Sequence, residues 1–376
     1  MENNIVRVML WGNEVGLLYW SHQQHRAVFE YNKDFLQKGI DIAPLTASIY
    51  KPISKKSILG DKDKLYQGLP PFIADSLPDF WGNLVFESWA KEQGLSTKQI
   101  TPVDKLSFIG SRAMGALEFQ PAYSLQQIDE DIQLSSLYNL AKRIFDERSE
   151  ISVFPEESLT LQSLYTIGTS AGGKHPKAII AINNNTKEIK SGQIDLPKEF
   201  TNYILKFSET DSIPYTEIEY AYYLMAKECG INIMPSKLIC IDNKNHFLTE
   251  RYDRINGERI HTQTLAAMDT VATSYEDLMS CARKLGVSSQ DIEQLFIRIL
   301  FNIWAGNVDD HTKNFSFMLQ KNKKWSITPA YDLTFTMSID GPKYENRHYL
   351  SLRGKVSDFN YQDLLQFAHK LTSFDR

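Results

Sequence analysis

The N-terminal region alternates apolar and polar residues with the period of two that is typical of β-strands. Residues 5–11 and 15–20 show this pattern, and Gly12-Asn13-Glu14 between them suits a hairpin turn. Residues 27–31 predict a third strand. The chain is therefore expected to begin as an antiparallel sheet.

A helix and another strand-like run follow this sheet. Asp79 can cap a helix that stops at Gly94 and whose apolar residues recur at helical spacing. These apolar residues are Trp81, Leu84, Val85 and Trp89. The run 105–121 ends as a strand. Residues 1–120 together predict an α+β domain.

The centre of the chain, residues 121–255, predicts a second, β-rich part. It opens with a polar, helix-prone connector, and residues 164–182 predict a strand, a glycine turn and a second strand. A helix is expected at 217–231. The other expected strands are residues 203–207, 236–241 and 246–252.

The third predicted part, residues 256–376, is mainly helical. Its helical pattern is interrupted by one hairpin at 315–330. The whole pattern predicts an α+β fold of three parts, with the β-rich part ahead of the helical one.

Composition narrows the class of protein. A length of 376 residues suits two or three domains, and 42% hydrophobic and 23% charged residues are ordinary for a globular protein. The net charge of −5 argues against a protein that coats nucleic acid. Three scattered cysteines predict neither a cysteine zinc site nor a disulfide framework, and fit a reducing cytosol. We expect no signal peptide and no membrane span, hence a cytoplasmic location.

A glycine-rich turn is the first candidate binding element. It runs from Ser170 to Lys177 and contains Gly172, Gly173 and Lys174. Consecutive glycines let backbone N–H groups approach an anion, and lysines add positive charge, so a phosphate site is one reading. A plain β-turn with solvated lysines is the other. The turn lacks the P-loop pattern.

A lysine and a glutamate farther along extend this candidate. Lys206 lies in an apolar strand, on the face opposite Tyr203, so it needs a partner, a ligand or a route to solvent. Glu219 is a possible ion-pair partner of Lys206, with Glu217 as the competing acid. Thr216 and Glu219 also fit a helix capping box, which would be a structural role.

The segment AGNVDDHTKNFSF, residues 305–317, carries the strongest candidate chemistry. Asp309 is followed by four residues and then Asn314, the spacing of a kinase catalytic base and a Mg²⁺ ligand. Asp332, after the predicted hairpin, supplies a second oxygen ligand. Two alternatives remain at this point: a solvated surface turn, and a transition-metal site built on Asp310 and His311.

In order and spacing, these motifs resemble the HipA toxin kinases of bacterial toxin–antitoxin systems. The resemblance rests on SAGGKHPK (170–177), YILKF (203–207), IEYAYYLMAKECGI (218–231), LTERYDR (248–254), AGNVDDHTKNFS (305–316) and TPAYDL (328–333). Softer matches are LWGNEVGLLYW, SLPDFWG (76–82) and SFIGSRAMGALEF (107–119). The resemblance implies a bilobal kinase-like fold with an extra N-terminal subdomain, and an ATP- and Mg²⁺-dependent serine/threonine kinase.

The resemblance also assigns roles to residues. It implies that Asp309 is the catalytic base, that Asn314 and Asp332 hold Mg²⁺, and that Ser170 is an inactivating autophosphorylation site. Glu250 and Tyr252 match the hinge beside adenine. The implied ATP-binding residues are Gly172, Gly173, Lys174, His175, Lys177, Lys206, Glu250, Tyr252, His311, Lys313 and Tyr331. The other reading of the hinge is a strand end with exposed charges.

Partners follow from the resemblance as well. It implies a target among the aminoacyl-tRNA synthetases, notably the glutamate-specific enzyme, whose phosphorylation stalls translation and favours growth arrest and persistence. It implies a small helix-turn-helix antitoxin, similar to HipB, through which operator DNA is bound. Two rival functions remain: a pseudokinase that only binds partners, and a metal-dependent nuclease or phosphatase built on Asp309, Asp310 and His311.

Overall fold

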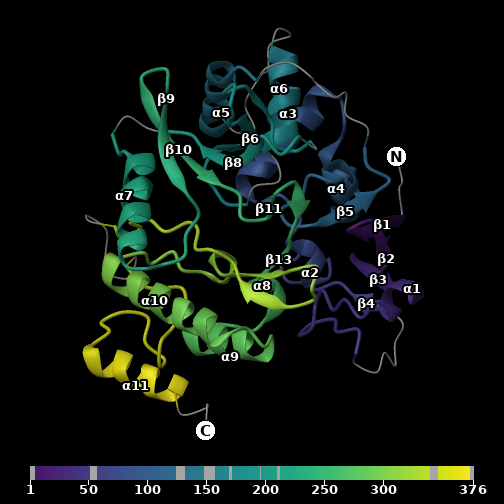
Figure 1. Ribbon diagram of the computed structural model, residues 1–376. Coiled ribbons are helices and arrows are strands. Elements are labelled where there is room, and N and C mark those ends of the chain that lie inside the picture. Colours follow the sequence, from purple (N-terminus) through teal and green to yellow (C-terminus); the bar gives the residue numbers. More distant parts are fainter. Residues whose placement is uncertain are drawn as a thin grey trace. The chain divides into compact units, whose positions relative to one another are not determined.

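The computed structural model describes residues 5–50, 57–123, 132–147, 157–168, 172–194, 196–209, 212–338 and 346–372 (Figure 1). The chain forms two compact units. Unit 1 comprises residues 1–41, 49–217 and 235–261, and unit 2 comprises residues 42–48, 218–234 and 262–376.

Unit 1 begins with the antiparallel sheet that the alternating pattern predicts. Its strand order is β4-β3-β2-β1-β5. The strands are β1 (Ile5–Leu10), β2 (Asn13–Ser21), β3 (Arg26–Tyr31), β4 (Ile58–Leu59) and β5 (Leu117–Gln120). The first turn lies slightly earlier than expected, because Trp11 and Gly12 take the positive φ angles (49° and 74°) and Asn13 already belongs to β2.

Helices and short turns accompany this sheet. They are α1 (Lys33–Gln37), α2 (Pro71–Ala74), α3 (Phe80–Glu92), the 3-10 turn η1 (Thr97–Gln99) and α4 (Pro102–Ile109). The predicted helix after Asp79 is confirmed, with Gly94 in the left-handed region just beyond its end. The sequence pattern did not predict α4, which begins with a capping box between Thr101 and Asp104.

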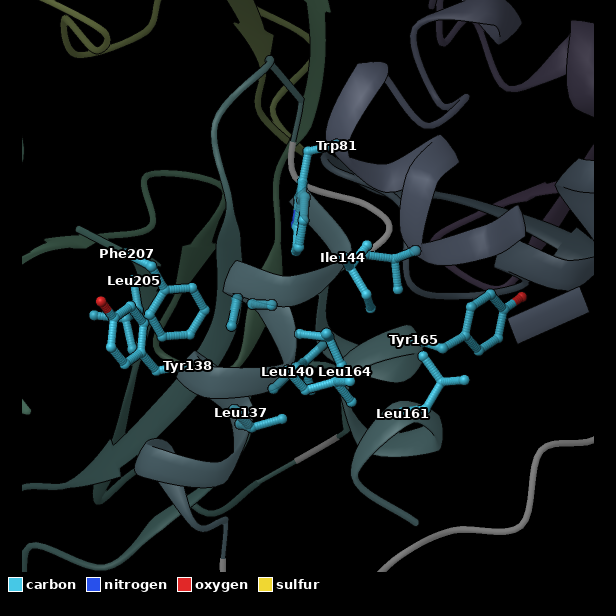
Figure 2. Close-up of a cluster of buried hydrophobic side chains, with 14 of the residues drawn as sticks. Trp81, Leu137, Tyr138, Leu140, Ile144, Leu161, Leu164, Tyr165, Leu205 and Phe207 are labelled. Atoms are coloured by element: carbon cyan, nitrogen blue, oxygen red, sulfur yellow. The ribbon is translucent and has the colours of Figure 1, made fainter. Parts of the chain in front are cut away.

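A second antiparallel sheet in unit 1 has the order β7-β6-β8-β10-β9. Its strands are β6 (Lys177–Asn183), β7 (Ile189–Ser191), β8 (Phe200–Lys206), β9 (Ser236–Ile241) and β10 (Lys244–Glu250). Helices α3, α5 (Leu134–Glu147) and α6 (Ser158–Gly168) pack together over this sheet (Figure 1). Figure 2 shows the core between them, where Leu140, Leu164 and Leu205 are fully or almost fully buried.

The predicted strand ahead of the glycine turn is wrong, because residues 164–168 end helix α6. Leu161, Leu164, Tyr165 and Gly168 are buried at helical spacing. The helical period of 3.6 residues can be recognised only when the residues from Ser158 onward are included. The glycine turn therefore joins a helix to strand β6, and does not join two strands.

Unit 2 contains most of the C-terminal helices. They are α8 (Leu265–Met268), α9 (Tyr275–Lys284), α10 (Ser289–Ala305) and α11 (Tyr361–Thr372), and α7 (Tyr215–Glu228) enters this unit at Ile218. The three-stranded sheet β13-β14-β15 consists of β13 (His261–Thr264), β14 (Ser316–Leu319) and β15 (Trp325–Ile327). Capping boxes at Ser274 and Ser288 begin α9 and α10.

The expectation that the chain is mainly helical from residue 256, with one hairpin at 315–330, needs correction where this part begins. Strands β11 (Arg254–Ile255) and β12 (Glu258–Arg259) form a hairpin, and β13 follows. Asn256 and Gly257 take φ angles of 52° and 80° in the turn of this hairpin. An Asn-Gly pair favours such a turn. Along the described part of the chain, no helix combines the length and apolar character that crossing a bilayer requires.

A buried histidine in unit 1 gives a pH-dependent prediction. His246 is fully buried, accepts a hydrogen bond from the Ser208 N–H at 3.0 Å through Nδ1, and lies 3.3 Å from the Ile241 carbonyl through Nε2. Burial lowers the pKa of His246, so the folded chain favours the neutral ring. An unfolded histidine has a pKa of about 6.5, and stability from this group is therefore lost as the pH falls below that value.

We expect the melting temperature of the wild type to fall more steeply than that of His246→Gln between pH 7.5 and pH 5. Thermal unfolding of both chains at the two pH values measures the difference. Parallel curves would show that His246 contributes nothing to the pH dependence.

Candidate active site

The glycine turn and two lysines lie where two inner strands of the second sheet of unit 1 begin and end. Lys177 begins β6 and Lys206 ends β8, and the two residues face each other directly across the strands. Lys177 is only 3% exposed, and its Nζ donates a hydrogen bond to the Gly172 carbonyl. Like charges directly opposite each other destabilise a sheet, and acceptors such as this carbonyl, or an anion, offset that repulsion.

The face of the strand that carries Lys206 agrees with the alternation in its sequence. Tyr203, Leu205 and Phe207 belong to the hydrophobic core with α3, α5 and α6. Lys206 takes the opposite face, where its Nζ lies 5.9 Å from the ring centroid of Phe247, its neighbour on β10. The predicted division of this strand into two faces is confirmed.

The glycine turn is held by Trp81 of helix α3 and by Asp79 at the N-cap of that helix. The Gly173 N–H donates to Asp79 Oδ2 at 2.9 Å, and the Trp81 indole N–H donates to the Lys177 carbonyl at 2.8 Å. His175 pairs with Glu209, while Lys174 is exposed. Ser170 lies outside the described residues. The sequence signal for this contact between the helix and the glycine turn is the pair Asp79 and Trp81 in SLPDFWG.

The two hinge candidates, Glu250 and Tyr252, lie at and just after the end of strand β10 in the same sheet. Glu250 ends β10, opposite Tyr203. Burial raises the pKa of the Glu250 carboxyl, and Lys237 and Tyr203 partly offset this effect. Tyr252 is half-buried.

The charges that follow Glu250 are not exposed, so that alternative reading is wrong. Arg251 and Asp253 are 2% and 0% exposed. Two hydrogen bonds of 2.8 and 2.7 Å join their side chains, and Arg254 adds a third at 2.9 Å. Burial alone would raise the pKa of Asp253, but the two arginines hold it well below its usual range. The Gly115 N–H also donates to Asp253, so the hinge segment is anchored to the N-terminal part of unit 1.

The first half of α7 contains both acids proposed as partners of Lys206, and Glu217 lies in its first turn. Glu217 accepts hydrogen bonds from the Thr216 hydroxyl at 2.9 Å and from the Asn245 amide at 3.1 Å. Thr216 lies inside α7 and donates to the Asn245 carbonyl. Glu219 is half-buried in α7, on the segment that belongs to unit 2. Its pairing with Lys206 stays a prediction.

Unit 2 presents the Asp309 segment as a loop between α10 and β14. Helix α10 ends at Gly306, whose φ of 69° suits a glycine C-cap. The hydroxyl of Thr336 accepts hydrogen bonds from the N–H groups of Val308 (2.8 Å) and Asp309 (3.1 Å). The Asn314 amide donates to the Asp309 carbonyl at 2.7 Å. These bonds fix the backbone on both sides of the Asp309 side chain, which is 51% exposed.

The neighbouring carboxylate points the other way. Asp310 is fully buried, and its oxygens accept hydrogen bonds from the Tyr275 hydroxyl and from the Tyr349 N–H at 2.8 Å. His348 Nδ1 lies 2.9 Å from the same carboxylate. Burial, followed by the nearby Asp310 charge, raises the pKa of Tyr275. Asp310 is therefore an internal anchor of the loop.

This geometry disfavours a metal site that joins Asp309, Asp310 and His311. The Asp309 side chain is half exposed, whereas Asp310 is fully buried among its own hydrogen-bond partners, so the two carboxylates do not face one ion. Within the described residues, no three His, Cys, Asp or Glu side chains form a candidate metal cluster. Mg²⁺ requires fewer protein ligands, because it usually keeps several waters and substrate oxygens.

The second predicted metal ligand is tied to the same loop. The Tyr331 hydroxyl donates to the Lys313 carbonyl at 2.8 Å and lies 2.5 Å from the Ser316 hydroxyl. Tyr331 thereby joins the segment of Asp332 to the 3-10 turn η4 (Thr312–Asn314). Asp332 has a φ of +52°, an uncommon angle for a residue other than glycine. Such strained residues concentrate at functional sites.

Buried side chains of α10 support this arrangement. Arg298 is 4% exposed and donates to the Thr328 carbonyl at 2.7 Å, close before Asp332 in sequence. Burial lowers the pKa of Arg298 to about 10. Asn302 accepts a hydrogen bond from the Asn307 amide at 2.9 Å. The sequence pattern gave no signal for these contacts.

Comparison with known proteins adds curated relatives. A candidate kinase of Haemophilus influenzae is 26% identical over 203 residues, covering 49% of this chain and 57% of that protein. The candidate kinase Y4mE of Sinorhizobium fredii is 23% identical over 332 residues, covering 82% of this chain and 72% of that protein. The chain thus spans little more than half the length of the first relative.

A solved structure and two family models complete the comparison. HipA of Shewanella oneidensis, in complex with HipB and its operator DNA, matches with a TM-score of 0.65 and 19% identity, covering 98% of this chain and 84% of that chain. This likeness confirms the expected mixed α/β fold. The model described as HipA N-terminal domain matches residues 6–120, and the model described as HipA-like C-terminal domain matches residues 169–375. The second match covers more than half of the chain, which therefore belongs to the HipA-like family.

Proposed function

We propose that this chain is an ATP- and Mg²⁺-dependent serine/threonine protein kinase and the toxin of a toxin–antitoxin module. The observation that carries the proposal is the cross-strand pair of Lys177 and Lys206 beside the glycine turn. Two lysines paired across neighbouring strands beside a glycine turn suit the phosphates of a nucleotide. The candidate kinases among the relatives support this reading.

Each unit supplies part of the proposed machinery. In unit 1, Lys206, Lys177 and the turn around Gly173 bind the triphosphate, with Lys174 and His175 beside them. The hinge residues Glu250 and Tyr252 meet the base. In unit 2, Asp309 orients the hydroxyl of the protein substrate and accepts its proton.

The remaining predicted residues of unit 2 serve the metal and the nucleotide. Asn314 and Asp332 are oxygen ligands suited to Mg²⁺. His311 and Lys313 lie on the same loop as Asn314, and the Tyr331 hydroxyl is hydrogen-bonded to that loop. When bound, the ion neutralises charge on the transferring phosphoryl group. The same proposal divides the chain into three parts. Residues 1–120 form the N-terminal subdomain, residues 121–255 the kinase N-lobe and residues 256–376 the kinase C-lobe.

Regulation and partners complete the proposal. Ser170, at the start of the glycine turn, is the site of inactivating autophosphorylation. The target is an aminoacyl-tRNA synthetase of the glutamate-specific type, and its modification in the cytoplasm stalls translation and favours persistence. The solved HipA complex supports a HipB-like helix-turn-helix antitoxin as partner, with operator DNA bound through it.

Transfer of label from [γ-³²P]ATP tests the kinase proposal. The purified chain with Mg²⁺ is expected to label itself or an added aminoacyl-tRNA synthetase on serine or threonine, and chelation of Mg²⁺ should stop the labelling. ATP binding without any transfer, to itself or to a proteome extract, would instead identify a pseudokinase.

Lys206→Met tests whether the cross-strand pair of Lys177 and Lys206 binds the nucleotide. Loss of an ammonium that binds phosphate removes a charged hydrogen bond worth about 1.5–3 kcal/mol, which corresponds to roughly 10- to 100-fold in the Kd for ATP. Isothermal titration measures this change. Lys198→Met, at an exposed lysine of the same unit, is the control and should bind like the wild type. Equal affinity in both variants would remove Lys206 from the nucleotide site.

A further inference from the structure

The start of helix α3 departs from the usual role of an N-cap aspartate. An aspartate at this position normally accepts a hydrogen bond from an N–H in the first turn of its own helix, which stabilises the helix. Asp79 occupies the N-cap of α3, and its side chain makes no such bond. It accepts from the Gly173 N–H at 2.9 Å instead. A local rule broken in this way indicates that the side chain serves another element.

The bond from Asp79 is one of two that grip a single peptide group. The peptide between Gly172 and Gly173 offers its carbonyl to Lys177 Nζ and its N–H to Asp79 Oδ2. Both polar atoms of this peptide are thus engaged by charged side chains. Rotation of the peptide plane would break both bonds together.

The ends of two charged side chains lie close to the two glycines of the turn. A Cβ on Gly172 would lie 2.9 Å from Asp79 Oδ2, and a Cβ on Gly173 would lie 2.6 Å from Lys177 Nζ. Gly173 also has a φ of +101°, which other residues rarely adopt. The two charged side chains therefore lie directly against the backbone of the turn.

A second residue of α3 holds the rest of the turn. The backbone N–H of Trp81 donates to the Gly173 carbonyl at 3.3 Å, and its indole N–H donates to the Lys177 carbonyl at 2.8 Å. Trp81 is itself fully buried in the core of unit 1 (Figure 2). The segment from Gly173 to Lys177 is thus fixed at both ends to a rigid helix.

From these contacts we propose that Asp79 is a positioning residue for the nucleotide. It holds the Gly172–Gly173 peptide, and with it the Lys177 ammonium, in the arrangement that receives the phosphates. The inference rests on the proposed kinase function. A turn that is ordered before binding loses less conformational entropy when the nucleotide binds, so Asp79 contributes to affinity without touching the transferred group.

Steady-state kinetics with ATP as the varied substrate tests this role. Asp79→Ala is expected to raise the KM for ATP about tenfold and to leave kcat at saturating ATP within about twofold of the wild type. Asp79→Asn keeps an oxygen that can accept from Gly173, and should recover most of the loss. Glu87→Gln, at an exposed acid on the same helix, is the matched control and should behave like the wild type.

Two results would overturn the proposal. An unchanged or lowered KM in Asp79→Ala would show that the carboxylate does not help, or that it competes with phosphate. An equal loss of kcat and of melting temperature in Asp79→Ala and Asp79→Asn would show a purely structural role.

Hydrogen exchange of the segment 172–177, measured without nucleotide, separates this inference from the kinase proposal. Faster exchange in Asp79→Ala, but not in Glu87→Gln, is expected whatever reaction the chain catalyses. If the wild type binds no ATP but Asp79→Ala still exchanges faster than Glu87→Gln, only the kinase proposal is refuted. Unchanged exchange would refute the positioning role of Asp79 alone.

Discussion

Replacing Asp309 with asparagine is expected to abolish phosphate transfer and to leave ATP binding intact. The side chain is half exposed in a loop whose backbone is held by Thr336 and Asn314. Asparagine has the same shape but cannot accept the proton of the substrate hydroxyl. General-base catalysis contributes roughly 10²–10⁴-fold, so kcat should fall at least about a hundredfold.

Label transfer and ATP titration on the same preparations measure the two halves of this prediction. Glu293→Gln changes an exposed acid on α10 and serves as the control for charge. Residual transfer within a few-fold of the wild type would assign the base elsewhere. A large loss of ATP affinity would instead place Asp309 in the nucleotide or metal site.

The adjacent residue should behave in the opposite way. Asp310→Ala leaves the Tyr275 hydroxyl, the Tyr349 N–H and His348 without their acceptor in the interior of unit 2. Each buried group left unsatisfied costs about 1–3 kcal/mol, so we expect a loss of about 3 kcal/mol or more in the free energy of unfolding. Urea unfolding measures it.

Asp309→Ala is the matched control for this stability measurement, because it removes the same side chain one residue earlier. Its free energy of unfolding should stay within about 0.5 kcal/mol of the wild type, as is usual for exposed positions. Similar losses in both alanine variants would contradict the anchoring role of Asp310. Together the two pairs of variants separate chemistry from stability at neighbouring carboxylates.

Much of this arrangement follows from linear patterns in the sequence. Alternation predicts strands β1, β2 and β3 and the separate faces of Tyr203 and Lys206, since a strand's period of two is a local property. The interval between Asp309 and Asn314 favours Asp309 over Asp310 as the base. The structure agrees in that Asp310 is fully buried and Asp309 is not. The catalytic roles themselves remain proposals.

Other features depend on contacts between distant segments and gave no local signal. The burial of Asp310 is set by residues 35 and 38 positions away in sequence. The bond between Asp79 and Gly173 spans 94 positions. The end of α6 reads as a strand in the sequence because a run as short as residues 164–168 does not distinguish the two periods. Packing against α3 and α5 decides the outcome there.

The anchoring of Asp310 bears on the order in which the chain is made. Tyr275 precedes Asp310, but His348 and Tyr349 leave the ribosome well after it. A nascent chain that ends before His348 lacks two of the three groups that hold this carboxylate. At roughly 5–20 residues per second, the interval between Asp310 and Tyr349 lasts some seconds. The loop that carries Asp309 therefore reaches its final form only after His348 and Tyr349 have been synthesised, so a shorter nascent chain lacks the complete loop.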